Sequence, residues 1–380
     1  MRRFMMCMNS FFALLLMSVS IHAQSLTNRL DALLAKWNHK DEPGMAVLLV
    51  RNGRIAYRKG FGLADVDAHR PITPNTQFLL ASVTKQFTAM AIMVLAEREK
   101  LQFADTLAKY CPEFPAYART ITIRNLLNHT GGLTEYHELL VGKVEDENYE
   151  RSSKSPPATH EFTAIEALQI LSRQQTLRFA PGEKFEYSNS GYVILGQIIE
   201  RVTGQRYAEF LKETIFDPLG MHDTLVVDER NQKVPRLALG YEKRNGEWRD
   251  ITYTPENHIY GEDDVVSTVN DLYKWDQALY TDRLVRSSTL EMAFTPGHTN
   301  DGKEIATHIL KRPNSYGFGW FISSLDGDKD VEHSGGWSGY RTDILRVPAR
   351  RVTAIVLTNS SNDEVTDIAE QIVEVAGKLL

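Results

Sequence analysis

The chain has 380 residues and a formal net charge of −6, and 42% of its residues are hydrophobic and 24% charged. These values are ordinary for a globular protein and exclude a disordered chain, and the length suffices for one large domain or two interlocked ones. The acidic balance argues against nucleic acid as a partner, because phosphate binding depends on clustered lysine and arginine.

Residues 1 to 23 have the pattern of a secretory signal peptide. Two arginines form a basic start, residues 11 to 19 form an apolar core, and the small residue Ala23 suits cleavage. The apolar run is short for a membrane span of about 20 residues, although a retained anchor remains an alternative. Cleavage would remove both arginines and no acid, so the net charge would fall by two, to −8, and Cys111 would be the one remaining cysteine. The chain would then have no internal disulfide. Because the signal peptide directs export, we expect a periplasmic or secreted location.

The two ends of the chain predict one antiparallel sheet. Residues 26 to 37 carry apolar side chains at helical spacing, and in residues 45 to 62 Asn52-Gly53 separates two β-rich runs, which favours a hairpin with a tight primed turn. Near the other end, strands are predicted at residues 316 to 324, 329 to 336, 340 to 348 and 352 to 359, followed by a helix at 364 to 380. Two N-terminal and about three C-terminal strands, with a helix at each end, fit a sheet flanked by helices.

The middle of the chain, from about residue 105 to 261, has a different pattern. Helical segments such as residues 122 to 129 and 192 to 204 are joined by loops that contain proline and glycine. We therefore expect an α+β fold, in which a sheet part at about 24 to 104 and 262 to 380 carries an inserted, mostly helical subdomain. Residues 141 to 160 are polar and without periodicity, which suggests a mobile surface loop or a lid.

Residues 81 to 97 begin with a serine three places before a lysine and then become apolar. At a helix start, residues i and i+3 share a face, so Ser82 and Lys85 can touch. A serine hydroxyl needs a base, and a lysine in an apolar surround can have its pKa lowered enough to serve. The helix N-terminus also offers free N–H groups and a positive dipole end to an oxyanion. Alone the pattern is weak, because a helix cap followed by an exposed lysine explains it equally well.

Two further motifs strengthen this interpretation. Tyr187-Ser188-Asn189 is the one Tyr-x-Asn in the chain, and His333-Ser334-Gly335, followed by Gly336, lies on a predicted strand. In this order, the three elements resemble the serine β-lactamase and DD-peptidase superfamily, and specifically its class C-like branch, where Tyr-x-Asn replaces Ser-Asp-Asn. The resemblance extends over nearly all of residues 26 to 380, through similar phrases at 126 to 133, 181 to 192, 217 to 221, 265 to 275 and 316 to 320.

The resemblance implies a catalytic set for acyl transfer. Ser82 would be the nucleophile, and Lys85 would share its proton with Tyr187, whose phenolate would act as base and later return the proton to the leaving group. Asn189 would hold the substrate amide and fix the lysine.

The resemblance also assigns the strand motif to substrate binding. The backbone N–H groups of Ser82 and Gly336 would form the oxyanion hole, while His333 and Ser334 would line the strand edge along which substrate lies. Gly335 would leave room for the substrate backbone to approach.

His333 is the departure with the largest consequence for substrate choice. Many β-lactamases have lysine at this position, and its fixed charge helps to attract anionic substrates, whereas histidine, with an unperturbed pKa of about 6.5, is mostly neutral at pH 7. Within the family, His-x-Gly is more typical of D-specific peptidases, amidases and some esterases. The sequence therefore favours a peptide, amide or ester substrate over a β-lactam antibiotic. If protonation of His333 matters, rates should change near neutral pH.

Four other residues have structural interpretations beside functional ones. Arg341 suits a surface or structural role better than binding of a substrate carboxylate. His129 is expected to shape a turn through local hydrogen bonds. Trp337 and Tyr340 fit the rim of a substrate groove and core packing equally well.

No metal or nucleotide cofactor is implied. The His-Glu pairs at 137 to 138 and 160 to 161 lack the second histidine of a zinc helix, and Glu304 stands where a phosphate loop needs Ser or Thr. The Gly-x-Ser-x-Gly turn of α/β-hydrolases does not occur. The sequence thus predicts an exported serine hydrolase with a peptide or small-molecule substrate. The alternative from another class is a non-catalytic binder of cell-wall peptide, which would not need the proton-transfer residues.

Overall fold

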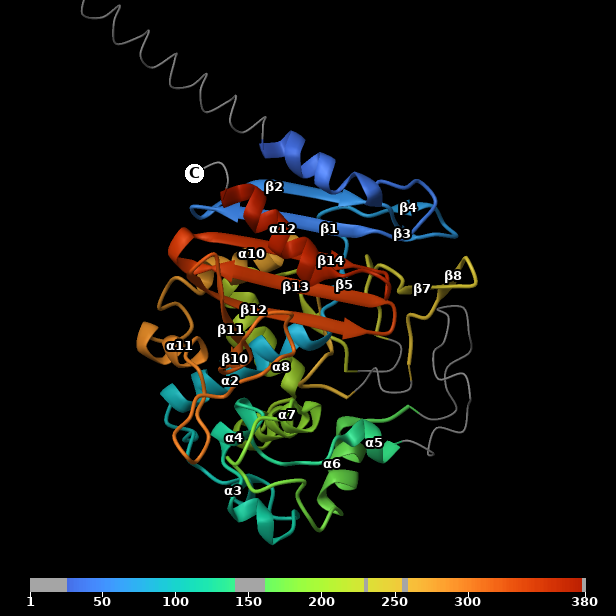
Figure 1. Cartoon of the computed structure of the whole chain (residues 1–380). Coiled ribbons are helices and arrows are strands. Elements are labelled where there is room, and N and C mark those ends of the chain that lie inside the picture. Colours follow the sequence, from blue (N-terminus) through green and yellow to red (C-terminus); the bar gives the residue numbers. More distant parts are fainter. Residues whose placement is uncertain (1–25, 141–160, 229–231, 255–258, 378–380) are drawn as a thin grey trace, which may run out of the picture.

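The computed structural model describes residues 26–140, 161–228, 232–254 and 259–377. Its centre is a seven-stranded antiparallel sheet with the order β10-β11-β12-β13-β14-β1-β2, so that the N-terminal hairpin extends the C-terminal strands (Figure 1). This confirms the predicted sheet built from both ends of the chain. The strands are β1 Met45–Arg51, β2 Arg54–Phe61, β10 Ser315–Tyr316, β11 Phe321–Leu325, β12 Asp328–Trp337, β13 Tyr340–Val347 and β14 Val352–Thr358.

The β1–β2 connection is the predicted hairpin. Asn52 and Gly53 have φ angles of 52° and 73°, the left-handed values that a primed turn requires at both positions. Arg51 therefore pairs directly with Arg54 across the turn.

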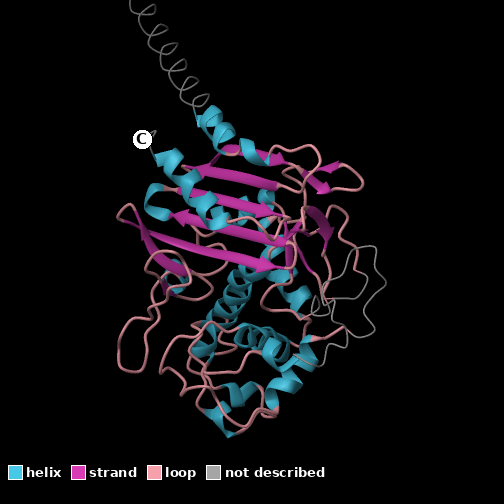
Figure 2. Cartoon of the chain, turned by 45° about the vertical axis from the view of Figure 1, so that its right-hand side comes forward, coloured by secondary structure: helices cyan, strands magenta, loops and turns pink. Residues whose placement is uncertain are grey.

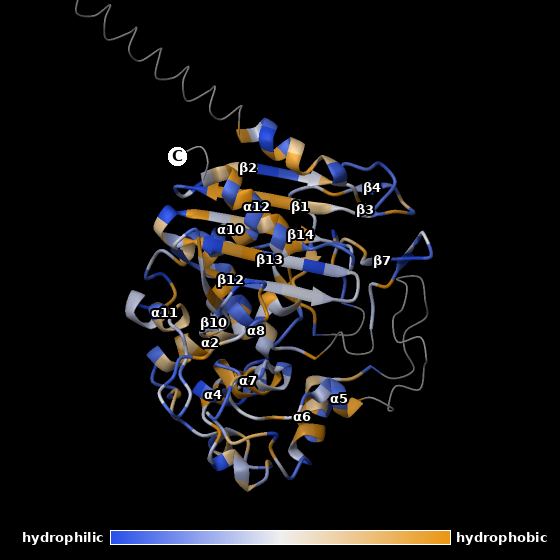
Figure 3. Ribbon diagram, in the orientation of Figure 1, coloured by the Kyte–Doolittle hydropathy of each residue, from blue (hydrophilic) through white to orange (hydrophobic). Residues whose placement is uncertain are grey.

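Hydrophobic layers cover both faces of the sheet. On one face, α12 Val365–Gly377 and the helical residues 26–33 pack against alternate residues of the strands, and Leu26, Leu30 and Leu34 supply one buried stripe at helical spacing. The larger core on the other face contains the buried helix α2 Thr84–Glu97 and α10 Val269–Ala278. Figure 3 shows β1 hydrophobic along most of its length, while the edge strand β2 carries hydrophilic stretches.

The helices of the middle segment gather beyond one edge of the sheet (Figure 2). The last of them ends at Leu219, and the strands described between Leu219 and α10 are short. The helices are α3 Leu107–Tyr110, α4 Ile123–Leu127, α5 Tyr136–Leu140, α6 Ala164–Ser172, α7 Asn189–Thr203, α8 Tyr207–Leu211 and α9 Asp217–Leu219, and the strands are β6 Leu225–Val226, β7 Tyr241–Arg244, β8 Glu247–Asp250 and β9 Val265–Ser267. The remaining elements are β3 Leu63–Asp65, β4 Arg70–Pro71, β5 Phe78–Leu79, α11 Ser287–Ala293, the π-helix η4 Lys212–Phe216 and the 3-10 helices η1 Ala35–Trp37, η2 Ala81–Val83, η3 Ala116–Arg119 and η5 Pro348–Arg350.

Two predictions fall outside the described residues, namely the signal peptide at residues 1 to 23 and the lid at 141 to 160. Across the described ranges, no helix combines the length and the apolar character that crossing a bilayer requires.

The turn that carries Ser82 is fixed between the sheet and β9. The α-helix begins at Thr84, and Ser82 lies in the preceding 3-10 helix η2. Ala81 has a φ of 48°, a strained value for a residue with a side chain. The turn is held because the Leu80 N–H donates to Val265 O at 2.8 Å and Thr342 Oγ1 donates to Leu80 O at 2.6 Å.

Gly335 is required by this turn, a reason that the sequence did not indicate, and its role toward substrate stays a prediction. A Cβ on Gly335 would lie 2.2 Å from Leu80 O and 2.4 Å from Thr342 Oγ1. The absent side chain thus lets β12 pack directly against the backbone that positions Ser82.

We predict that Gly335→Ala destabilises the fold, whereas Gly336→Ala does not. The new methyl group at 335 must displace the Leu80 carbonyl, at a cost of about 1–3 kcal/mol. At 336 the nearest atom to a Cβ is Arg341 Nη1 at 3.6 Å, an ordinary contact. Thermal unfolding of the two variants measures the difference, and equal melting temperatures would contradict the prediction.

Candidate active site

Ser82 and Lys85 meet as their spacing predicts. Ser82 is partly exposed, Lys85 is fully buried, and Lys85 Nζ lies 3.0 Å from Ser82 Oγ. The contact follows from the step from η2 into the first turn of α2, which places residues i and i+3 on one face.

Glu262 is a residue of this site that the sequence motifs did not reveal. Its carboxylate is buried, and Oε2 accepts from Lys85 Nζ at 3.0 Å while Oε1 accepts from the Tyr136 hydroxyl at 2.6 Å. Lys85 also donates to Glu262 O at 3.1 Å, so its three ammonium protons have three acceptors, one of which is Ser82 Oγ. The available signal was an acidic run, residues 262 to 264, placed immediately before the buried strand β9.

The ion pair corrects the expected protonation of Lys85. Burial alone would lower the pKa of Lys85, but the nearby Tyr187 and the Glu262 carboxylate raise it above its ordinary value. Lys85 is therefore an ammonium ion at neutral pH and not a neutral amine. Its direct contribution to Ser82 is a charged hydrogen bond to Oγ.

Tyr187 completes the cluster from the loop before α7. Lys85 Nζ lies 5.1 Å from the centre of its ring. Burial raises the pKa of Tyr187, and the nearby positive charge of Lys85 opposes that rise. The phenol is therefore protonated in most molecules at neutral pH.

His129 holds Tyr187 in place. The imidazole ring lies 4.3 Å from the Tyr187 ring, centroid to centroid, and its Nδ1 accepts from the Ser188 N–H at 3.0 Å. Because Nδ1 accepts, the proton of the neutral ring is on Nε2. The local hydrogen bond expected from the sequence is present, and it connects the turn of residue 129 to the start of α7.

Asn189 does not fix the lysine, in contrast to the expectation from the family resemblance. The acceptors of Lys85 are supplied by Ser82 and Glu262, and Asn189 Oδ1 is buried with no hydrogen-bond partner among the described residues. The backbone N–H of Asn189 donates to Glu135 Oε2 at 2.9 Å, which places a carboxylate at the N-terminus of α7. Burial is the main cause that raises the pKa of Glu135 to about 6.

His333 is buried beside this cluster and is uncharged. Its Nδ1–H donates to Ser334 O at 2.7 Å, and its Nε2 accepts from the Tyr316 hydroxyl at 2.9 Å. Burial, followed by the charge of Lys85, lowers the pKa of His333 to about 3. The titration near neutral pH that the sequence suggested for His333 is therefore not expected.

At the end of β12, one edge of the strand leaves its backbone N–H and C=O groups unpaired with any described strand. β11 pairs with β12 only as far as Glu332, so within the described chain residues 333–337 have no strand on that side. The two-residue turn after Trp337 makes Trp337 and Tyr340 a hydrogen-bonded pair, so the N–H of Gly336 points away from β13 toward the open edge. Because side chains alternate along a strand, Ser334 and His333 lie on opposite faces of β12, and their place along a bound substrate stays a prediction.

The remaining candidates have structural contacts. Arg341 donates to the carbonyl oxygens of Trp337 and Tyr340 at 2.9 and 2.7 Å, and the buried Tyr340 hydroxyl donates to Ala238 O at 2.7 Å. Trp337 is partly exposed, with its ring 5.8 Å from that of His137. Among the side chains that the structure describes, no group of three or more His, Cys, Asp or Glu residues is placed to hold a metal ion.

Comparisons with known sequences match almost the whole chain. The family described as Beta-lactamase matches residues 27–377. Penicillin-binding protein 4* of Bacillus subtilis (strain 168) is 32% identical over 373 residues, covering 94% of this chain and 76% of that protein. Protein flp of Staphylococcus aureus (strain NCTC 8325 / PS 47) is 29% identical over 341 residues, covering 87% of this chain and 62% of flp, so this chain spans less than two-thirds of the latter.

Solved structures show the same fold. The octameric penicillin-binding protein homologue from Pyrococcus abyssi superposes with a TM-score of 0.80 at 28% identity, covering 92% of this chain and 77% of that one. The D-amino acid amidase from Ochrobactrum anthropi SV3, complexed with L-phenylalanine amide, has a TM-score of 0.75 at 23% identity and covers 93% of this chain and 99% of its own, a likeness of fold alone.

We predict that Glu262→Gln leaves a buried cation without its counterion. Breaking such a pair should cost about 3–5 kcal/mol of stability near neutral pH. In the wild type, the raised pKa of Lys85 contributes stability below its unfolded pKa of about 10.4 that is lost as the pH rises through the folded value. Without Glu262 that pKa falls, so the deficit should shrink as the pH rises.

Urea unfolding of both proteins between pH 6 and pH 9.5 measures this. Tyr136→Phe is the matched control, because it removes one hydrogen bond to Glu262 but keeps the ion pair, and should cost only about 1 kcal/mol. A deficit independent of pH would show that the charge of Glu262 has no part in it.

Proposed function

Since the chain belongs to the beta-lactamase family of serine hydrolases, we propose that it hydrolyses a peptide, amide or ester through an acyl-enzyme on Ser82. The observation that carries the proposal is the convergence of a partly exposed hydroxyl and a buried ammonium from one segment with a phenol from a distant one. In acyl transfer these groups serve as nucleophile, electrostatic stabiliser and base.

Acylation begins in molecules in which Tyr187 is ionised. Ser82 Oγ attacks the substrate carbonyl carbon while its proton passes to the Tyr187 oxygen, and Lys85 stabilises the charge that develops on Oγ. As the tetrahedral intermediate collapses, the bond to the leaving group breaks and Tyr187 returns the proton to that group. Water then attacks the ester of Ser82, with Tyr187 again taking and returning a proton, and the acid product leaves.

Backbone N–H groups supply the oxyanion hole. The N–H of Ser82 lies in the 3-10 turn η2 that precedes α2, and the N–H of Gly336 points to the open edge of β12. Both are held by packing of the strand against the Ser82 turn, so they need no reorganisation when the carbonyl oxygen becomes negative.

His333 is the observation that favours a peptide, amide or ester substrate. Because it is neutral, the site lacks the fixed positive charge that a lysine would place beside the nucleophile to attract an anionic β-lactam. The fold shared with a D-amino acid amidase agrees with this choice. Among peptides, a fragment of cell-wall peptide is the substrate class proposed for this relative of a penicillin-binding protein. A class C-like β-lactamase is the second candidate function.

A non-catalytic binder of cell-wall peptide is the weaker alternative. Binding does not need a buried ammonium held 3.0 Å from a serine oxygen. Export to the periplasm or the medium is part of the proposal and depends on residues 1 to 23, which lie outside the described residues.

We predict that a fluorophosphonate forms a covalent adduct on Ser82 and that Ser82→Ala lowers turnover by several orders of magnitude, because positioning does not replace a nucleophile. Intact mass detects the adduct. Parallel assays with D-alanyl peptides, p-nitrophenyl butyrate and nitrocefin assign the substrate class, with the peptide or ester faster than nitrocefin. A wild type without an adduct, and turnover equal in Ser82→Ala, would exclude the acyl-enzyme.

We predict that the acylation rate rises from pH 6.5 to pH 9, by at most tenfold per unit. The pKa of Tyr187 is raised above 10, so its ionised fraction grows with pH, while His333, with a pKa near 3, does not titrate in this range. Fluorophosphonate labelling at a series of pH values measures the rate. Glu135→Gln is the control for a contribution from that carboxyl, and an inflection near pH 6.5 that disappears only in His333→Gln would refute the assignment.

A further inference from the structure

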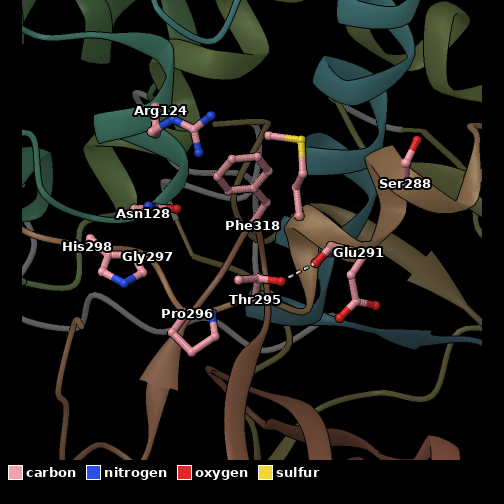
Figure 4. A pocket seen from close by; sticks show the side chains of 10 residues that line it. Arg124, Asn128, Ser288, Glu291, Thr295, Pro296, Gly297, His298 and Phe318 are labelled. Atoms are coloured by element: carbon pink, nitrogen blue, oxygen red, sulfur yellow. Dashed lines mark hydrogen bonds between the residues drawn. The ribbon is translucent and has the colours of Figure 1, made fainter. Parts of the chain in front are cut away.

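A cavity of about 380 Å³ lies between α4, α11 and the loop before β10, apart from the cluster around Ser82. Figure 4 shows Arg124 and Asn128 on one wall, Glu291 and Ser288 on the opposite wall and Phe318 between them. The volume falls in the range of sites for small organic molecules. None of the residues that the acyl-transfer proposal uses lines this cavity.

Arg124 gives the cavity its charge. No ion-pair partner of its guanidinium occurs among the described residues, and the group lies over the rings of Phe103 and Phe318, 5.6 and 5.4 Å from their centres. Glu291 on the opposite wall is neutralised by Lys329 at 2.9 Å. The uncompensated charge is thus positive, and a planar guanidinium matches a carboxylate with two parallel hydrogen bonds.

Asn128 adds an unmet polar group. Its side chain is 2% exposed, and Oδ1 is buried without a hydrogen-bond partner within the described ranges. Leaving such a group unpaired is costly, and a ligand that donates a hydrogen bond, after a small rotation of the amide, would satisfy it. Met292, Pro296 and Phe318 supply an apolar surface beside these polar groups.

We propose that this cavity is a binding site for a small organic carboxylate with an apolar body. Arg124 matches the charge and the paired acceptor oxygens of a single carboxylate, whereas Asn128 Oδ1 would accept from a donor group elsewhere on the ligand. Inorganic phosphate fits less well, because it carries more charge toward the Glu291 wall and needs more donors than the cavity offers. The site does not depend on the acyl-transfer proposal, since its residues are different.

Calorimetric titration of the Ser82→Ala protein with benzoate tests the site, with inorganic phosphate as a second probe. Saturable binding of benzoate is expected, at least tenfold tighter than that of phosphate. Arg124→Gln should weaken benzoate binding at least tenfold, whereas Arg119→Gln, an exposed arginine at the end of η3, should change it less than twofold.

Ser288→Trp provides a test that keeps Arg124. Ser288 is exposed at the rim, so the indole ring can fill the cavity without disturbing the core, and it should also weaken binding at least tenfold. Thermal unfolding checks that each variant is folded. Absence of saturable binding, equal affinity for phosphate, or binding unchanged in the folded Arg124→Gln and Ser288→Trp proteins would each overturn the proposal.

Discussion

The buried ion pair between Lys85 and Glu262 is the interaction on which the chemistry of this site depends. An ammonium ion at 0% exposure is tolerated only with a counterion and with acceptors for its protons, and Glu262 supplies a carboxylate oxygen and its own carbonyl. The third proton is directed at Ser82 Oγ. Because the pair keeps Lys85 charged, the proposed reaction assigns the role of base to Tyr187, and the positive charge beside Tyr187 limits how far burial raises the pKa of the phenol. Glu262 thus helps to keep Lys85 charged, and Lys85 in turn acts on Tyr187.

The frame around the pair restricts the nucleophile through backbone contacts. Leu80 is hydrogen-bonded to Val265 and to Thr342, and Gly335 brings β12 into contact with the same carbonyl, so the strained Ala81 cannot relax. The partners come from β9, β12 and β13, which are distant from residue 80 in the sequence. β12 and β13 belong to the seven-stranded sheet, and β9 pairs with β5, the strand immediately before Leu80. This explains why a short 3-10 turn with one unfavourable residue persists at this position.

The neutral, buried His333 changes the character of the site without changing its geometry. It bonds to the Tyr316 hydroxyl and to a carbonyl, and its ring lies 6.2 Å from that of Tyr187, where it adds apolar contact and no charge. The charge of Lys85, the cation next to Ser82, is neutralised by Glu262. Such a site stabilises charge that develops on the reacting atoms and attracts anionic substrates only weakly.

The sequence by itself determined the elements and the residues that act through local spacing. Asn52-Gly53 favoured a primed turn, the C-terminal β-rich runs predicted strands, and Ser82 and Lys85 could touch because they are three positions apart at the start of a helix. The tertiary structure decided which groups of the site are charged and which are neutral. Glu262 lies 177 residues beyond Lys85 in the sequence. No periodicity indicates that the Lys85 ammonium donates to the Glu262 carboxylate rather than to Asn189. Likewise, the pKa of His333 and the reason for Gly335 depend on burial and on contacts across the sheet. Local pattern specifies backbone conformation, whereas desolvation and pairing of charges depend on which distant segments fold together.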